Sequence, residues 1–205
     1  MDELKQFRSN LEYHFSEFLG YPFARPYWVY ISLSHQCTYN CQMCSVVKIL
    51  KGYELQKDAL FRALDEISGW KEGCTVLFTG GEPFLRKDIF EVIDYSLKKG
   101  LKIEAVSNGS LIDRDLASRI VSCGLSNIAI SLDGARPETH DSIREKGSFA
   151  KAVNALALLA ELKEKQGRGP QISAWTTIMK ENVRELFDII PLVKNIGVES
   201  LVYQQ

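Results

Sequence analysis

The sequence predicts an α/β protein with a parallel sheet, in the form of a partial (β/α)6 TIM-like barrel whose helices lie outside the strands. Three observations support this fold class. Short apolar runs alternate with longer amphipathic segments, the short runs are nearly continuous in apolar residues, and glycine follows most of the amphipathic segments. Continuous apolar runs are typical of strands buried on both faces, which favours a parallel sheet. A doubly wound open sheet is the alternative with the same order of elements.

Six short segments are predicted to be the strands, because they are apolar and rich in β-branched and aromatic residues. They are residues 28–34, 75–80, 102–107, 127–132, 171–179 and 200–205. In both candidate folds, ligands bind at the carboxyl ends of the strands. The residues that follow each strand are therefore the first place to look for chemistry.

The amphipathic segments between the strands are predicted to be helices that begin at polar capping residues. The expected caps are Asp88, Asp113 and Ser148, together with a capping box formed by Asn182 and Glu185. Pro191 falls inside the last of these segments, and a proline there should kink the helix or split it.

Residues 1–26 precede the first strand and form a predicted helical extension, with the core domain covering 27–205 and ending within the sixth strand. Apolar residues recur every three or four positions at Leu4, Phe7, Leu11, Phe15 and Phe18. This spacing predicts a helix that packs on the barrel. A helix lying on a membrane surface is a weaker alternative, because its polar face mixes charges of both signs.

The composition is that of an ordinary globular protein of 205 residues with a net charge of −1. No basic field is present to attract nucleic acid. No apolar run approaches the roughly 18 residues of a membrane span, and the N-terminus does not resemble a secretory signal. These features predict a cytoplasmic protein. Its five cysteines then suggest metal binding or catalysis rather than disulfides.

Three cysteines fall within eight positions after the first predicted strand. Cys37, Cys41 and Cys44 follow the spacing C-x3-C-x2-C. A closed zinc site needs four protein ligands, and the remaining cysteines, Cys74 and Cys123, are expected at the opposite end of the barrel. A [4Fe–4S] cluster held by three thiolates would instead keep one iron open to another ligand. The spacing therefore favours a cluster with an open position.

Polar fragments follow the next three strands. They read TGGEP at 79–83, SNG at 107–109 and SLDG at 131–134. Each has an ordinary explanation as a turn. Because all of them are expected at the same end of the barrel as the cysteines, together they predict a binding site.

The cysteine motif followed by TGGEP resembles the radical S-adenosylmethionine (radical SAM) superfamily. The stretch at 140–149, HDSIREKGSF, is similar to a segment of members that modify peptides or carry extra C-terminal cluster domains. The chain as a whole resembles members related to the SPASM, peptide-modifying and cofactor-maturation subgroups. The resemblance implies two cofactors, a [4Fe–4S] cluster and SAM. It implies reductive cleavage of SAM to methionine and a 5′-deoxyadenosyl radical, which abstracts hydrogen from a substrate. A low-potential electron donor of the flavodoxin or ferredoxin type is implied as a partner.

The resemblance also implies roles for individual residues. Cys37, Cys41 and Cys44 would ligate three irons, and SAM would chelate the fourth through its amine and carboxylate. The SAM amine would meet Gly80, Gly81, Glu82 and Pro83. The polar ends of SAM would meet Ser107 and Asn108, its ribose Ser131 and Asp133, its carboxylate Arg144, and its adenine Met43 and Asn182.

Two further classes of function stay open. A zinc-binding structural protein would need a fourth thiolate or imidazole near Cys37, for which His35 is the nearest candidate. A simple [4Fe–4S] electron carrier would need four cysteine ligands and no SAM. For the substrate, peptide modification, cofactor maturation and radical methylation are all compatible with these residues.

Overall fold

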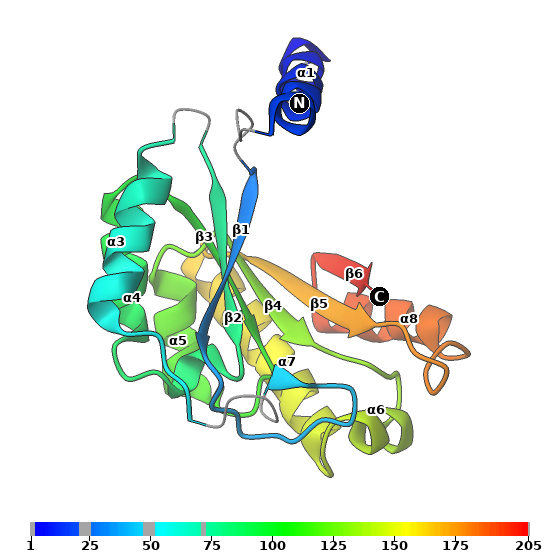
Figure 1. The fold of residues 1–205 in the computed structure, drawn as a ribbon. Helices are drawn as coiled ribbons and strands as arrows, with labels where there is room; N and C mark the ends of the chain where they lie inside the picture. Colours follow the sequence, from blue (N-terminus) through cyan, green and yellow to red (C-terminus); the bar gives the residue numbers. More distant parts are fainter. Residues whose placement is uncertain (1–2, 21–25, 47–51, 71–72, 205) are drawn as a thin grey trace.

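The computed structural model describes residues 3–20, 26–46, 52–70 and 73–204, and its centre is a curved, wholly parallel sheet (Figure 1). Its strands follow one another in chain order. They are β1 (Trp28–Ser34), β2 (Thr75–Gly80), β3 (Lys102–Ser107), β4 (Asn127–Ser131), β5 (Gln171–Thr177) and β6 (Ser200–Gln204). The six predicted strands are confirmed, although β4 and β5 end one and two residues earlier than expected.

Helices other than α1 cover the outer face of the sheet (Figure 1). In chain order, the helices are α1 (Glu3–Leu19), α3 (Lys57–Ser68), η1 (Pro83–Leu85), α4 (Ile89–Lys98), α5 (Arg114–Ser122), α6 (Pro137–Ile143), α7 (Ser148–Gln166) and α8 (Leu186–Ile196). The short helices η1 and α6 were not predicted, because each lies within a stretch interpreted as a strand-end turn or its continuation. Both pack near the carboxyl ends of the strands and so help to shape the site.

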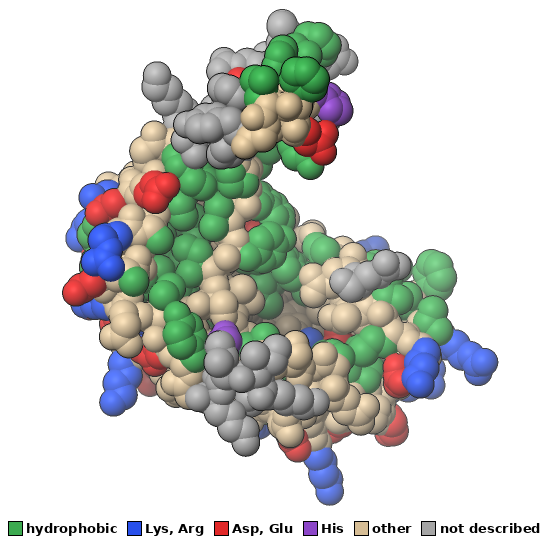
Figure 2. Space-filling view, in the orientation of Figure 1, with side chains coloured by type: hydrophobic (Ala, Val, Ile, Leu, Met, Phe, Trp, Pro, Cys, Tyr) green, Lys and Arg blue, Asp and Glu red, His purple; other side chains and the backbone are tan. Residues whose placement is uncertain are grey.

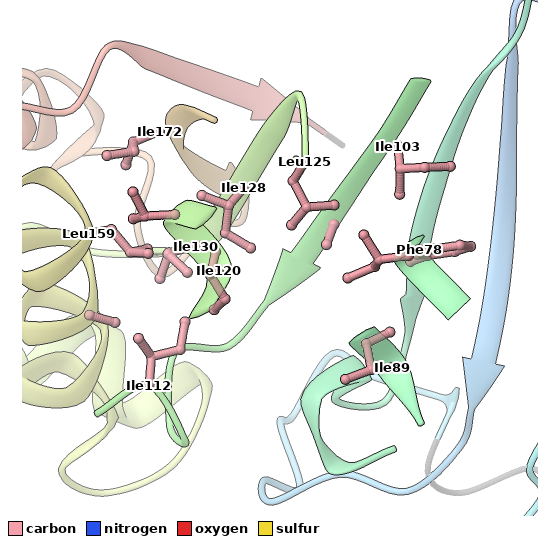
Figure 3. Close-up of a cluster of buried hydrophobic side chains, with 14 of the residues drawn as sticks. Phe78, Ile89, Ile103, Ile112, Ile120, Leu125, Ile128, Ile130, Leu159 and Ile172 are labelled. Carbon is pink, nitrogen blue, oxygen red and sulfur yellow. The ribbon is translucent and has the colours of Figure 1, made fainter. Parts of the chain in front are cut away.

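The main core lies between the sheet and the outer helices (Figure 3). Phe78 and Ile103 from neighbouring strands pack with Ile128, Ile120 and other fully buried side chains. Burying each such side chain contributes roughly 1.5–3 kcal/mol. A smaller cluster of Leu77, Ala129 and Trp175 occupies the inner face. The nearly continuous apolar runs are thus explained, since the strands bury side chains on both faces.

Two of the predicted helix caps are wrong. Asp113 does cap α5, where its carboxylate accepts from the Leu116 amide at 2.8 Å. The Asp88 side chain makes no capping bond and pairs with Arg86 instead. Ser148 is the first residue of α7, and its place as cap is taken by the Asp141 carboxylate, which accepts from the backbone amides of Gly147 and Phe149.

The predicted capping box before α8 is also wrong, because the helix begins only at Leu186. The Asn182 side chain closes its own turn by accepting from the Met179 amide at 2.8 Å. The Glu185 carboxylate reaches across to the segment after β4 and accepts from the Ala135 amide. Helix α8 continues through Pro191 without being split.

Helix α1 does not pack on the barrel as expected. It lies beyond the N-terminal end of β1, and its apolar side chains are exposed (Figures 1 and 2). Phe7, Leu11, Phe15 and Phe18 are all exposed, whereas the Leu4 side chain lies outside the described part of the structure. Within the described residues, no helix is both long and apolar enough to cross a membrane.

Candidate functional site

A cavity of about 270 Å³ opens at the carboxyl ends of the strands. Most of the residues predicted for the site line it, in particular the three cysteines of the motif. Its lining comprises Cys37, Tyr39, Cys41, Met43, Cys44, Thr79, Gly80, Gly81, Val106, Ser107, Asn108, Ser131, Arg144 and Gln204. Four predicted residues, Glu82, Pro83, Asp133 and Asn182, lie behind this surface rather than on it.

The glycine pair at the end of β2, Gly80 and Gly81, holds the start of the cysteine loop. A Cβ at Gly80 would overlap the Ser34 carbonyl oxygen, and one at Gly81 would overlap the Gln36 carbonyl oxygen. The Gly81 amide donates to Ser34 O at 2.7 Å, and the Glu82 amide donates to Gln36 O at 2.8 Å. Gly80 also has a φ of +127°, which favours glycine. The pair therefore allows two backbones to touch directly beneath Cys37.

The Glu82 carboxylate points into the protein, not into the cavity. It is fully buried and accepts from the Asn108 amide at 2.8 Å, the Ser107 hydroxyl at 3.0 Å and the Phe84 amide at 3.2 Å. Burial raises its pKa to about 7, against the opposing effect of these hydrogen bonds. Glu82 thus joins the turns after β2 and β3, and its expected contact with the SAM amine stays a prediction.

Asn108 extends this connection to the cysteine loop. Its Nδ2 lies 3.0 Å from Thr38 Oγ1 and 3.5 Å from Cys37 Sγ, and donates to both. Thr38 Oγ1 in turn lies 2.6 Å from Ser110 Oγ. Hydrogen bonds therefore link the loops after β1, β2 and β3 into one wall of the cavity.

Asp133 and Arg144 form an ion pair on the opposite side. Arg144 Nε lies 2.6 Å from Asp133 Oδ2, and Asp133 Oδ1 accepts from the Thr177 amide at 2.8 Å. Asp133 is fully buried, whereas the Arg144 side chain is 11% exposed and lines the cavity. Both oxygens of the Asp133 carboxylate thus have protein partners, and the ribose contact expected from its strand-end position stays a prediction.

Asn182 and His140 hold the backbone around this ion pair. Asn182 Nδ2 donates to the carbonyl oxygens of Asp133 and Thr177, at 2.9 and 2.8 Å. The Asp133 amide donates to His140 Nδ1 at 3.0 Å, and burial lowers the pKa of His140 to about 3. Asn182 is fully buried and its side chain holds the loop; its expected contact with the adenine stays a prediction.

The remaining predicted contacts are distributed between surface and interior. Ser131, at the end of β4, and Met43, from the cysteine loop, both line the cavity. Pro83 is buried as the first residue of η1. Ser131 and Met43 therefore face the cavity, and the SAM contacts expected of all three residues stay predictions.

The three cysteines are brought together on one loop against one cavity. Burial raises the pKa of Cys37 and of Cys41, and the nearby Arg144 guanidinium opposes the shift at Cys41. Within the described ranges, no three Cys, His, Asp or Glu side chains converge closely enough to hold a single metal ion. Cys74 and Cys123 lie before β2 and after α5, away from the motif.

This donor set fits a [4Fe–4S] cluster better than a single zinc ion. Thiolate sulfurs are the ligands that such clusters take, and a cluster needs its ligands spread around it rather than converging on one point. Three of them beside a cavity leave room for a further, non-protein ligand. His35, the proposed fourth zinc ligand, instead packs its ring against Tyr53.

Two residues that position the cysteine loop were missed by the sequence analysis. Gln42 donates through its backbone amide to Ile143 O and through Nε2 to Ser142 O, which ties the loop to the end of α6. Arg86 is buried and donates to Leu55 O at 2.7 Å, which fastens the returning chain to the turn before α4. Neither residue has a sequence signal for this role, because Ser142 and Leu55, the partners named here, lie 100 and 31 positions away.

Comparison with known proteins identifies the family. The model of the radical SAM superfamily matches residues 31–200. The Fe-coproporphyrin III synthase of Methanosarcina barkeri (strain Fusaro / DSM 804) is 32% identical over 166 residues, covering 80% of this chain and 40% of that protein. The mycofactocin maturase MftC of Mycobacterium ulcerans (strain Agy99) is 31% identical over 171 residues, covering 82% and 45%.

A solved structure shares the fold. Native anSMEcpe with bound AdoMet superimposes with a TM-score of 0.71 at 18% identity, covering 86% of this chain and 50% of that one. The chain spans less than half the length of these two curated relatives. Radical SAM enzymes use a [4Fe–4S] cluster and SAM. Since the family model spans most of the sheet and the whole cysteine motif, the chain belongs to the radical SAM superfamily.

Proposed function

We propose that this chain is the catalytic core of a radical SAM enzyme in which Cys37, Cys41 and Cys44 hold a [4Fe–4S] cluster. Bound together, the cluster and SAM would supply one-electron cleavage of SAM to methionine and a 5′-deoxyadenosyl radical that abstracts hydrogen from the substrate. The observation that carries the proposal is that all three thiols and the Arg144 guanidinium line one cavity. A carboxylate-bearing cofactor matches a guanidinium beside thiolate ligands.

The residues of the chain would bind and orient SAM in that cavity. Arg144 is proposed for the SAM carboxylate, because its side chain lines the cavity while Asp133 fixes its Nε. Gly80 and Gly81 are proposed for the amine, because they present backbone beside the cysteines. Ser131 and Met43 line the cavity and are proposed for the ribose and the adenine.

The proposed role is maturation of a cofactor, with a tetrapyrrole precursor as the first substrate to test. Support comes from the curated relatives, in which Fe-coproporphyrin III and heme synthases stand beside a mycofactocin maturase. A flavodoxin- or ferredoxin-type protein is proposed as electron donor.

Anaerobic reconstitution tests the proposal. The protein is loaded with iron and sulfide, reduced with dithionite and incubated with SAM. We expect 5′-deoxyadenosine and methionine in equal amounts, loss of both products in Cys41→Ala, and no such loss in Cys123→Ala, whose thiol lies away from the motif. A protein that binds no iron, or a Cys41→Ala variant as active as wild type, would refute it.

Substrate choice is tested by the same assay. Iron-coproporphyrin III is added in one arm and a ribosomally made precursor peptide in another. A modified tetrapyrrole, seen by mass spectrometry together with faster formation of 5′-deoxyadenosine, supports the first choice. Modification of the peptide alone replaces it with peptide maturation.

A further inference from the structure

We propose that Asn108 sets the reduction potential of the cluster by donating an amide hydrogen to the Cys37 sulfur. This inference rests on the proposed function, because it requires a cluster on Cys37. It assigns to Asn108 a different role from the SAM contact that the sequence suggested. Asn108 is thereby a positioning and tuning residue for the cluster, acting through its cysteine ligand.

The geometry places two donors on one sulfur. Asn108 Nδ2 lies 3.5 Å from Cys37 Sγ, and the Tyr39 backbone nitrogen lies at the same distance. These lengths are ordinary for N–H donors to sulfur, whose radius exceeds that of oxygen. The Tyr39 donor belongs to the backbone of the loop, so Asn108 is the donor that the choice of side chain controls.

The orientation of the Asn108 amide is fixed by its other bonds. Its Oδ1 accepts from the Ser110 amide at 2.8 Å, so Nδ2 must face the opposite way. There it donates to both Thr38 Oγ1 and Cys37 Sγ. The backbone amide of Asn108 is held by Glu82 Oε2 at 2.8 Å. Because every polar atom on this side chain has a partner, the amide cannot turn away from the sulfur without losing a bond.

The electrostatic consequence has a definite sign. Adding an electron to a cluster increases the negative charge on its sulfur ligands. A fixed N–H dipole aimed at the sulfur stabilises the more negative, reduced state, and it acts strongly here because Asn108 is buried. Hydrogen bonds to the sulfurs are one of the factors that set cluster potentials. Asn108 should therefore raise the midpoint potential.

The same network explains why asparagine rather than aspartate suits this position. Aspartate would keep an acceptor for the Ser110 amide but would turn an oxygen toward Cys37. The Thr38 hydroxyl can donate as well as accept, so it can satisfy that oxygen and the loops stay joined. The thiolate would lose its donor and gain a nearby negative charge.

The test is a redox titration of the reconstituted cluster in the absence of SAM. Electron paramagnetic resonance monitors the reduced cluster at each potential. Wild type, Asn108→Ala, Asn108→Asp and Thr38→Val are compared at equal iron content. We expect Asn108→Ala to shift the midpoint to a more negative potential, and Asn108→Asp to shift it further. Thr38→Val removes the neighbouring partner but leaves the donor to Cys37, so its midpoint should stay closest to wild type.

Several outcomes overturn the inference. It fails if Asn108→Ala titrates as wild type does, even when Asn108→Asp is shifted, because charge alone would then explain the change. It also fails if the Asn108 variants differ from wild type only when SAM is added, which would make Asn108 a SAM contact. If Asn108→Ala does not assemble a cluster, Asn108→Leu takes its place, because leucine also removes the donor without adding a charge.

Failure of the proposed function looks different from failure of this inference. In the first case, wild type binds no iron or does not cleave SAM. In the second, wild type binds iron and cleaves SAM, but the SAM-free potential does not depend on Asn108. The two proposals can therefore be refuted separately.

Discussion

In both walls of the cavity a fully buried carboxylate joins neighbouring loops, but only one of the two carboxylates is paired with a positive charge. On the cysteine side, Glu82 joins the turns after β2 and β3 through N–H and O–H donors alone. On the other side, Asp133 joins the ends of β4 and β5 and is paired with Arg144.

This difference polarises the cavity. Glu82 has its pKa raised to about 7 by burial, and its carboxylate adds to the rise in the pKa of Cys37 that burial causes. The Arg144 guanidinium acts in the opposite direction on Cys41. An anionic ligand beside the cysteines is therefore favoured on the Arg144 side, and hydrogen-bond donors must supply the stabilisation on the Glu82 side.

The largest expected effect comes from Gly81→Ala, which breaks the cysteine wall where two backbones touch. A Cβ would overlap the Gln36 carbonyl group. Overpacking costs about 1–3 kcal/mol when side chains can move; backbone cannot move as easily, so we expect at least ~3 kcal/mol of lost stability. Urea unfolding and iron content after reconstitution measure it. Gly69→Ala, where the added Cβ lies 3.3 Å from Glu66 O, is the milder control, and equal behaviour of the two variants would contradict the prediction.

The next largest effect is expected from Asp133→Asn, which removes one partner of the ion pair in the other wall. Breaking a buried pair from one side typically costs about 3–5 kcal/mol, because the remaining charge stays buried. Chemical denaturation of both proteins measures the change. The matched control is Asp188→Asn, which breaks the exposed pair with Arg136 and should change stability little. Similar small losses in both variants would show that the pair does not hold the wall.

His140→Asn tests the pH dependence of the Asp133 wall. Burial lowers the pKa of His140 to about 3, so the folded protein keeps the ring neutral, whereas the unfolded chain takes up a proton below about pH 6.5. Wild-type stability should therefore fall as pH falls from about 6.5 towards 3, by up to ~1.4 kcal/mol per pH unit from this group. Asparagine can still accept from the Asp133 amide. Denaturation at several pH values should show that the free energy of unfolding of the variant falls less steeply below about pH 6.5. Parallel curves for the two proteins would exclude His140 as the source of the acid sensitivity.

Glu82→Gln should give the smallest effect on stability. The contribution of Glu82 to stability falls as pH rises, whereas that of His140 falls as pH falls. The pKa of Glu82 rises from an ordinary 4.5 to about 7, so the folded protein keeps a proton that the unfolded chain loses. Its contribution is complete below about pH 4.5 and is lost as pH rises through about 7. The difference in stability between wild type and variant should change across that window and stay level above it. A constant difference from pH 4 to 8 would contradict the raised pKa.

The fold was largely predictable because its signal is local. Nearly continuous apolar runs gave all six strands, and Asp113 capped its helix as expected. The caps that failed did so for one reason. In each case another partner was available: the Asp88 carboxylate pairs with the nearby Arg86, the Glu185 carboxylate accepts from the distant Ala135 amide, and the Asp141 carboxylate replaces the side chain of Ser148.

The sequence predicted where the site residues gather, but not which way their side chains point. Strand-end polar residues do gather at one end of the sheet, and the three cysteines line one cavity there. Whether such a residue faces a ligand or a neighbouring loop depends on contacts far apart in the chain. Glu82, Asp133 and Asn182 all face neighbouring loops. No short motif records that distinction.

The links between the cysteine loop and the rest of the chain also constrain the order of events during folding. Asn108 meets Cys37 across 71 positions, and Gln42 meets Ser142 across 100. Contacts of such long range form late, because the intervening chain must first be ordered. When only the cysteine motif of a nascent chain has emerged from the ribosome, neither wall of the cavity has formed. Iron and sulfide delivered at that stage would meet loose thiols, so cluster insertion should follow the folding of at least four βα units.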